Sequence, residues 1–150
     1  MRVKSLDPST LTPGRERVWL ELLSGDQVSA GYIPVEVAKA EVEGPTVAIV
    51  AAIHGDELNG TATVQQVSRL LNERPLVAGT LMMIPVLNLH GFGTRQRWFM
   101  DNRDLNREMA SPVELTPMFQ KPSQRFGERL LRRLIDHVDY LLDLHTATTG

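Results

Sequence analysis

The chain has 150 residues, of which 42% are hydrophobic and 23% are charged, and its formal net charge is −2. This length suffices for one domain with a hydrophobic core, and the composition is that of an ordinary globular protein. The small negative charge argues against a general nucleic-acid-binding protein, and the lack of cysteine excludes thiolate metal sites, thiol nucleophiles and disulfides.

The N-terminal third of the chain predicts a loosely held segment followed by two strands. Residues 1–15 are polar, contain two prolines and lack the apolar run of a signal peptide. Because no segment of the chain has the length of a transmembrane helix, we expect a soluble cytoplasmic protein without a membrane partner. Residues 18–23 and 28–38 are typical of strands, and a turn with a Gly-Asp pair joins them at 24–27.

Strands and helices alternate in the middle of the chain. Residues 46–53 form an apolar run without alternation, as expected for a strand that is covered on both faces. Residues 58–72 carry apolar side chains at helical spacing, and residues 80–87 form the next apolar strand. Pro85 within this strand predicts a sheet edge, a bulge or the end of the strand.

A long irregular stretch, residues 88–123, opens the last part of the chain. A loop of this length in a compact domain is usually functional or disordered. Ser123 is a candidate cap for a helix that continues to about residue 136, and residues 138–145 form a further apolar strand. Strands that alternate with helices predict an α/β fold with helices layered on a largely parallel or mixed sheet.

Two of the predicted strands are followed or ended by histidines. His54-Gly-Asp-Glu57 comes directly after residues 46–53, and His145 ends the strand at 138–145. Ligands of open α/β sheets bind at the carboxyl ends of the strands, and His, Glu and His form a common catalytic zinc site with one open position. These three residues are candidate zinc ligands, provided that the fold brings the two strand ends together. Taken alone, the first motif fits an interpretation without a metal ion equally well, in which His54 is a polar turn residue and Glu57 is a favourable carboxylate in the first turn of a helix.

Two aspartates are candidates to hold the histidines in place. A metal-ligating histidine usually donates its second ring N–H to a carboxylate. Asp104 is one candidate acceptor. Asp143 competes for the role because it lies two residues before His145 on the same predicted strand, and residues two apart on a strand face the same way. A solvated carboxylate at a strand end is the alternative for Asp143.

Three motifs, in this order, resemble a known family. His54-Gly-Asp-Glu57, Asp104-Leu-Asn-Arg107 and Leu142-Asp-Leu-His145 have the order and approximate spacing of the succinylglutamate desuccinylase/aspartoacylase family, which is similar to the zinc carboxypeptidases. The resemblance spans residues 46–150. It implies a zinc carboxypeptidase-like α/β/α fold with a mixed sheet, one zinc ion on His54, Glu57 and His145, and a small-molecule substrate. That substrate would be an N-acyl amino acid or another carboxylate, whose amide is cleaved by metal-activated water.

The same resemblance suggests residues that bind the substrate. Asn106 and Arg107 match the family's substrate-binding pair, and a guanidinium fork suits a substrate carboxylate. The family has a further functional arginine upstream of this motif, for which Arg97 and Arg103 are candidates and Arg95 is not excluded. The alternative is a solvated loop in which the arginines pair with neighbouring acids.

The family's general base is a glutamate that comes well after the third metal ligand. No position up to Gly150 matches it, and Glu108 and Glu114 fall in the wrong part of the pattern. We therefore expect residues 1–150 to be the N-terminal portion of one longer catalytic domain, truncated after the third ligand and nearly inactive alone, with the base beyond Gly150. Two alternatives stay open: a zinc carboxypeptidase acting on peptide C-termini, and a non-catalytic module that binds metal or carboxylate.

Overall fold

The computed structural model describes residues 1–23, 31–110 and 120–146. Its strands are β1 (Arg2–Val3), β2 (Gly14–Leu23), β3 (Gly31–Lys39), β4 (Thr46–Ala51), β5 (Thr80–Ile84) and β6 (Tyr140–Leu144). Its helices are α1 (Leu58–Glu73), α2 (Leu89–Thr94), α3 (Leu105–Ala110) and α4 (Pro122–Arg133), with short 3-10 turns η1 (Pro8–Thr10) and η2 (Ile135–His137). The turn predicted at 24–27 lies outside the described residues.

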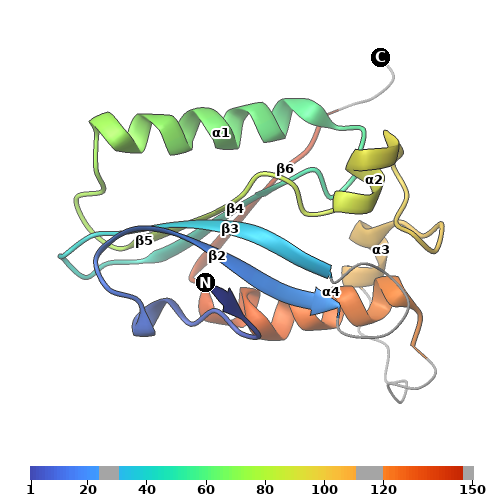
Figure 1. Ribbon diagram of the computed structural model, residues 1–150, viewed down its shortest axis with the longest axis horizontal. Coiled ribbons are helices and arrows are strands. Elements are labelled where there is room, and N and C mark those ends of the chain that lie inside the picture. Colours follow the sequence, from blue (N-terminus) through green and yellow to red (C-terminus); the bar gives the residue numbers. More distant parts are fainter. Residues whose placement is uncertain (24–30, 111–119, 147–150) are drawn as a thin grey trace.

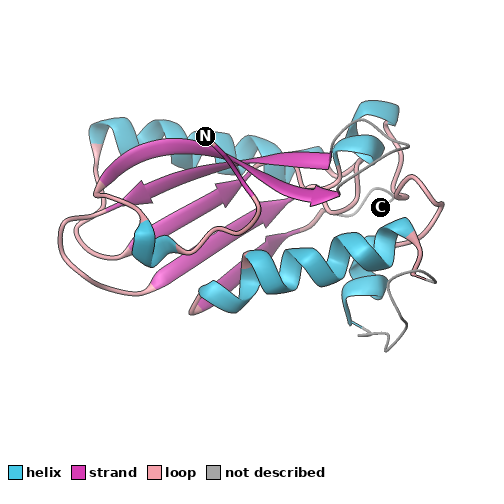
Figure 2. Ribbon diagram, turned by 60° about the horizontal axis from the view of Figure 1, so that its bottom comes forward, coloured by secondary structure: helices cyan, strands magenta, loops and turns pink. Residues whose placement is uncertain are grey.

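The strands form one sheet in the order β1-β2-β3-β5-β4-β6. β4 pairs in parallel with both β5 and β6, whereas β3 pairs antiparallel with β2 and with β5. α1 lies on one face of the sheet and α4 on the other (Figures 1 and 2). The prediction of a layered α/β fold with a mixed sheet is therefore confirmed.

Each face of the sheet has its own hydrophobic core. On the α1 side, Val64 and Leu71 of the helix pack with Ala51 and Met83 of the sheet. The larger core, on the α4 side, contains buried residues of β2, β3 and β5 together with the helix residues Phe126, Leu130 and the following Leu134. Phe126, Leu130 and Leu134 are spaced four residues apart, so they form one apolar stripe that faces the sheet.

The parallel strands place their carboxyl ends at one edge of the sheet. In the register of β4 and β6, Ala51 lies opposite Leu144, so the segments that follow these two strands start side by side. This topology brings together His54 and His145, which are far apart in the sequence. β5 ends at Ile84, so Pro85 marks the end of the strand, one of the three outcomes that its position predicts.

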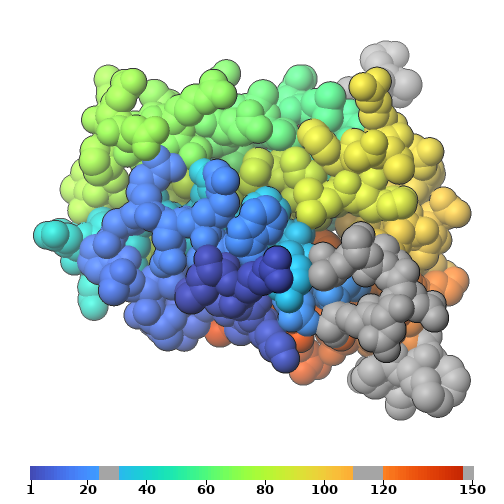
Figure 3. Space-filling model, viewed as in Figure 1, coloured from blue at the N-terminus to red at the C-terminus, as the bar shows by residue number. Residues whose placement is uncertain are grey.

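Two segments are more ordered than the sequence predicts. In the N-terminal segment, β1 pairs with β2 and Leu6 is buried, and Figure 3 shows these residues (dark blue) lying against the body of the molecule. The stretch at 88–123 contains the helices α2 and α3 in its described part. Each has six residues, fewer than two helical turns, which is too short for an apolar periodicity to be recognised.

None of the helices in the described ranges is both long and apolar enough to cross a bilayer.

Candidate metal centre

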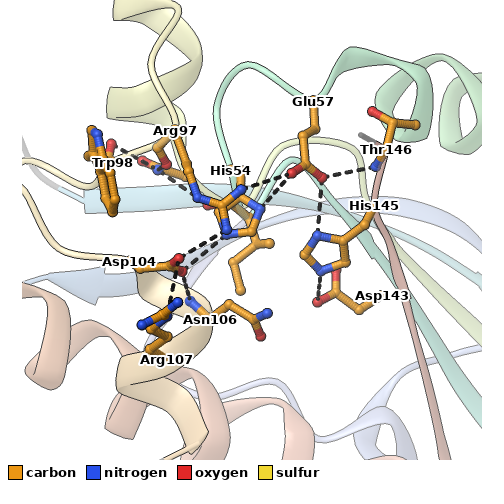
Figure 4. Close-up of polar contacts among 12 residues, drawn as sticks. His54, Glu57, Arg97, Trp98, Asp104, Asn106, Arg107, Asp143, His145 and Thr146 are labelled. Carbon is orange, nitrogen blue, oxygen red and sulfur yellow. Dashed lines mark hydrogen bonds and ion pairs between the residues drawn. The ribbon is translucent and has the colours of Figure 1, made fainter. Parts of the chain in front are cut away.

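His54, Glu57 and His145 converge at the carboxyl ends of β4 and β6. Each of the three offers a ligand atom, and these atoms lie within 4.8 Å of one another. The two imidazole rings are 5.0 Å apart, and the Glu57 carboxylate contacts both of them (Figure 4). The structure thus brings together the three residues that the sequence indicates as candidate ligands.

Close backbone packing shapes the turn that carries the first two of these residues. β4 leaves the sheet at Ala52, whose φ of 51° is left-handed, and the Glu57 N–H donates to the His54 carbonyl at 3.2 Å. A Cβ on Gly55 would lie 1.9 Å from the Gly91 carbonyl carbon, so this turn rests directly on the backbone of α2. Only glycine permits so close an approach.

Both histidines present the same ring nitrogen to Glu57. His54 Nδ1 lies 2.7 Å from Glu57 Oε1, and His145 Nδ1 lies 3.1 Å from Glu57 Oε2. The opposite nitrogens meet aspartates, with His54 Nε2 3.0 Å from Asp104 Oδ1 and His145 Nε2 2.9 Å from Asp143 Oδ2. A proton on each Nε2 leaves two Nδ1 lone pairs and one carboxylate facing a common point. This donor set fits a zinc ion, with an aspartate behind each histidine.

The surroundings of Glu57 and Asp104 lower the pKa of both carboxyl groups. Burial raises the pKa of the Glu57 carboxyl, but the Thr146 N–H at 2.9 Å and the contacts with both histidines outweigh it, so the pKa lies below its usual value. For Asp104, burial likewise raises the pKa, and the hydrogen bonds from His54 and Arg97 outweigh it. A ligand carboxylate has to be deprotonated to bind a metal ion, so these environments favour ligation.

The two candidate arginines upstream of the Asp104-Leu-Asn-Arg107 motif differ in their contacts. Arg97 lies with Nη1 3.4 Å from Glu57 Oε1 and Nη2 3.0 Å from Asp104 Oδ2, and thus bridges two acids of the centre. Arg103, the second candidate for this position, instead pairs with Glu108. The structure therefore places Arg97, and not the Arg103 side chain, beside the candidate ligands.

Asn106 and Arg107 lie at the start of α3, next to Asp104. The Asn106 backbone N–H donates to Asp104 Oδ1 at 3.1 Å, and Arg107 Nε is 3.9 Å from Asp104 Oδ2. The Arg107 side chain is 87% exposed, which leaves its guanidinium accessible to a ligand. Glu114, named above among the acids, lies outside the described residues.

Two groups at the centre were not anticipated from the sequence. One is the backbone N–H of Thr146, which donates to Glu57 Oε2. The other is the fully buried Asn88, whose side chain contacts the backbone next to both His54 and Arg97. Asn88 is the N-cap of α2, and asparagine is a preferred capping residue, but so short a helix gives the sequence no periodicity that would have singled this residue out.

The family model of the succinylglutamate desuccinylase/aspartoacylase catalytic domain matches residues 43–150, more than half of the chain. The chain belongs to this family. The resemblance that the three motifs indicate is thereby confirmed, and the match covers the whole candidate centre. The family groups deacylases and aspartoacylases.

Individual relatives agree with this assignment. The chain is 29% identical over 127 residues to an N-alpha-acetyl-L-2,4-diaminobutyric acid deacetylase of Halomonas elongata, covering 83% of the chain and 35% of that protein. It is 28% identical, with a TM-score of 0.75, to the crystal structure of a succinylglutamate desuccinylase/aspartoacylase from Rhodobacter sphaeroides, covering 95% of the chain and 43% of that structure. The chain thus spans well under half the length of these relatives.

The fold is also that of metallo-carboxypeptidases. A metallo-carboxypeptidase from Burkholderia cenocepacia superposes with a TM-score of 0.67 at 17% identity, covering 90% of the chain and 37% of that structure. At this identity the likeness concerns the fold alone, and it confirms the carboxypeptidase-like architecture.

Proposed function

We propose that this chain carries the zinc-binding part of a hydrolase that cleaves the amide bond of an N-acyl amino acid. One observation carries the proposal: two histidines direct their Nδ1 atoms at a single carboxylate, while an aspartate accepts from each Nε2. Membership of a deacylase family and the similarity to a deacetylase of an acetylated amino acid support the reaction type.

His54, Glu57 and His145 would hold the zinc ion. Zinc with three protein ligands lowers the pKa of a bound water to about 7 and polarises a carbonyl group. The aspartates behind the histidines fix the ring tautomer that leaves Nδ1 free to ligate. The Thr146 N–H and Arg97 hold the Glu57 carboxylate in its orientation between the two rings.

The arginines and Asn106 would recognise the substrate. An N-acyl amino acid has a carboxylate close to its amide, and the exposed Arg107 guanidinium can grip it with two parallel hydrogen bonds. Asn106 precedes Arg107 on α3 and offers amide donors on the same element. Arg97 lies beside Glu57, where its positive charge would stabilise the negative charge that develops on the carbonyl oxygen.

A general base is the remaining requirement of amide hydrolysis. The described carboxylates at the centre, Glu57, Asp104 and Asp143, each hydrogen-bond to a histidine and are thereby engaged in holding the site. Glu108 pairs with Arg103 instead. In line with the resemblance, we assign the base to a glutamate that comes well after His145 in the sequence.

Zinc uptake tests the first half of the proposal. We expect about one zinc ion per chain after dialysis against trace zinc, measured by elemental analysis. Replacing His54, Glu57 or His145 by alanine should abolish uptake, whereas His90→Ala, a change of an exposed histidine on α2, should retain it. Equal zinc content in all four variants would refute the site.

Hydrolysis tests the second half. The complete product of the gene should hydrolyse at least one substrate from a panel of acetyl-, succinyl- and aspartyl-type N-acyl amino acids. Release of a C-terminal residue from peptides, with no reaction on this panel, would instead identify a carboxypeptidase. Zinc binding without turnover of either class would identify a non-catalytic binding module.

A further inference from the structure

We propose that Asn88 is a positioning residue that fixes the loop of Arg97 against the end of β4, and so holds the Arg97 guanidinium at Glu57 and Asp104. The inference rests on the proposed function of the same centre. It assigns to Asn88 no contact with substrate or metal, and its effect is transmitted through Arg97.

The Asn88 amide hydrogen-bonds to backbone groups of several segments. Its Nδ2 donates to the carbonyls of Ile53 at 3.3 Å and Trp98 at 3.2 Å, with a longer contact of 3.5 Å to the Arg97 carbonyl. Its Oδ1 accepts from the Gly91 N–H at 2.9 Å. The reverse orientation of the amide would set an oxygen against these carbonyls and an NH2 group against an N–H. Only the observed orientation satisfies the site.

These contacts join three segments that meet at the centre. Ile53 directly precedes His54, Gly91 lies in α2, and Trp98 directly follows Arg97. The backbones of α2 and of the Arg97 loop touch, because a Cβ on Gly91 would lie 2.7 Å from the Gln96 carbonyl oxygen and 2.9 Å from the Trp98 carbonyl oxygen. Asn88 therefore links the segment that carries a candidate ligand with the segment that carries the candidate substrate arginine.

The Arg97 side chain needs such support because it is flexible. Its side chain is long and partly exposed, and its contacts at the centre are with two acids, one of them at 3.4 Å. A free arginine side chain has many rotamers, and ordering it costs conformational entropy. Fixing the backbone on both sides of its Cα narrows the positions that the guanidinium can reach. The two acids that it holds are a candidate ligand, Glu57, and the acceptor behind His54, Asp104.

Asn88→Asp separates this role from simple helix capping. Aspartate keeps an oxygen for the Gly91 N–H and is a good capping residue, but it removes both donors that hold the Ile53 and Trp98 carbonyls. If Asn88 only caps α2, the variant should bind zinc like the parent. If Asn88 positions Arg97, the variant should bind zinc about 10-fold more weakly, the lower end of the loss caused by removing an outer partner of a metal ligand.

A double-mutant cycle with Arg97→Ala shows whether the effect passes through the arginine. Zinc dissociation constants are measured by competition with a chromogenic chelator for the parent, Asn88→Asp, Arg97→Ala and the double variant. We expect the double variant to bind zinc no more weakly than whichever single variant binds zinc less tightly, because the effects of two substitutions do not add when the residues act as one unit. Effects that multiply, or a parent-like constant for Asn88→Asp, would overturn the inference.

Controls keep the cycle interpretable. Asn72→Asp introduces the same charge at an exposed position near the far end of α1 and should leave zinc affinity unchanged. If Asn88→Asp does not fold, as judged by circular dichroism, Asn88→Ser keeps an uncharged capping oxygen and enters the same cycle. Failure of the parent itself to bind zinc would refute the proposed function, whereas a zinc-binding parent with an unaffected Asn88 variant refutes only the role of Asn88.

Discussion

The two strands that precede the histidines, β4 and β6, are hydrogen-bonded neighbours, yet they differ in burial. β4 lies inside the sheet, and its residues Ala48, Val50 and Ala51 are all buried. β6 lies at the edge of the described sheet, and Tyr140, Leu141 and Leu142 are between 40% and 62% exposed. The difference extends to the histidines, whose side chains are 2% exposed at His54 and 34% exposed at His145.

The contrast indicates two different ways of holding a ligand. Packing fixes His54, since the turn after β4 rests on α2 and Asp104 accepts from the ring in a buried setting. His145 is held mainly by two charged contacts, to Glu57 and to the partly exposed Asp143, which solvent weakens. The centre thus has a buried half, His54 with Asp104, and an exposed half, His145 with Asp143. Glu57 contacts both histidines and joins these two halves. Variants of these residues should therefore have unequal effects, in a definite order.

The largest effect is expected for Glu57→Gln, because this variant removes the carboxylate that both halves share while keeping the size of the side chain. Zinc affinity should fall by more than about 100-fold, beyond the range seen when only an outer partner is lost. Competition titration with a chelator measures this change. Parent-like affinity would mean that the carboxylate is not a ligand.

The two histidines should differ in stability rather than in metal uptake. Both His54→Ala and His145→Ala should lose zinc. In the metal-free protein, His54→Ala should lower the free energy of unfolding by about 2–4 kcal/mol, because the buried carboxylates of Glu57 and Asp104 lose the histidine that they share. His145→Ala should cost less than about 1 kcal/mol, as for other solvent-screened pairs. Urea unfolding compares them, and equal losses would show that burial does not separate the two halves.

The same order should hold for the aspartates behind the histidines. Asp104→Asn should weaken zinc binding by about 10–100-fold, and Asp143→Asn by less than about 10-fold. The side chain of Asp104 is 8% exposed and that of Asp143 is 27% exposed, so solvent replaces the lost acceptor more readily at Asp143. A larger loss of zinc affinity for Asp143→Asn than for Asp104→Asn would contradict the assignment of His54 and Asp104 as the more firmly held half.

The sequence predicts the two strands and their histidines, but not the difference in burial between them. The apolar runs at 46–53 and 138–145 predicted both strands, whereas the adjacency of β4 and β6, which brings their carboxyl ends together, comes from the structure. The sequence of β6 is as apolar as that of β4, so its exposure had no signal in composition or periodicity. The choice of Arg97 over Arg103 depends on the path of an irregular loop, which side-chain patterns do not encode.

Arg107→Lys should have a moderate effect that is confined to ligand binding. Lysine keeps the positive charge but loses the planar pair of donors, so the affinity for an N-acetyl amino acid should fall by about 10-fold. Calorimetric titration of zinc-loaded protein measures it. Arg103→Lys is the matched control, because Arg103 pairs with Glu108 and should tolerate the change. Equal affinities in both variants would mark Arg107 as an ordinary solvated arginine.

The smallest expected effect is the pH dependence of stability in the metal-free protein. The pKa values of Glu57 and Asp104 lie below their ordinary 4.5 and 3.8, so their contribution is present above those values and is lost as the pH falls through the lowered pKa. For His145, burial lowers the pKa, but hydrogen bonds and charges of Asp143 and Glu57 outweigh it and raise the pKa above 6.5.

The histidine contribution therefore has the opposite sign. It is fully present below pH 6.5 and is lost as the pH rises through the raised pKa. Urea midpoints of the metal-free protein should thus decline on both sides of a plateau between about pH 4.5 and 6.5. His145→Gln should flatten the alkaline decline and Asp104→Asn the acid one. An alkaline decline that is unchanged in His145→Gln would show that the exposed half contributes nothing to folding, and that its histidine acts only when a metal ion is bound.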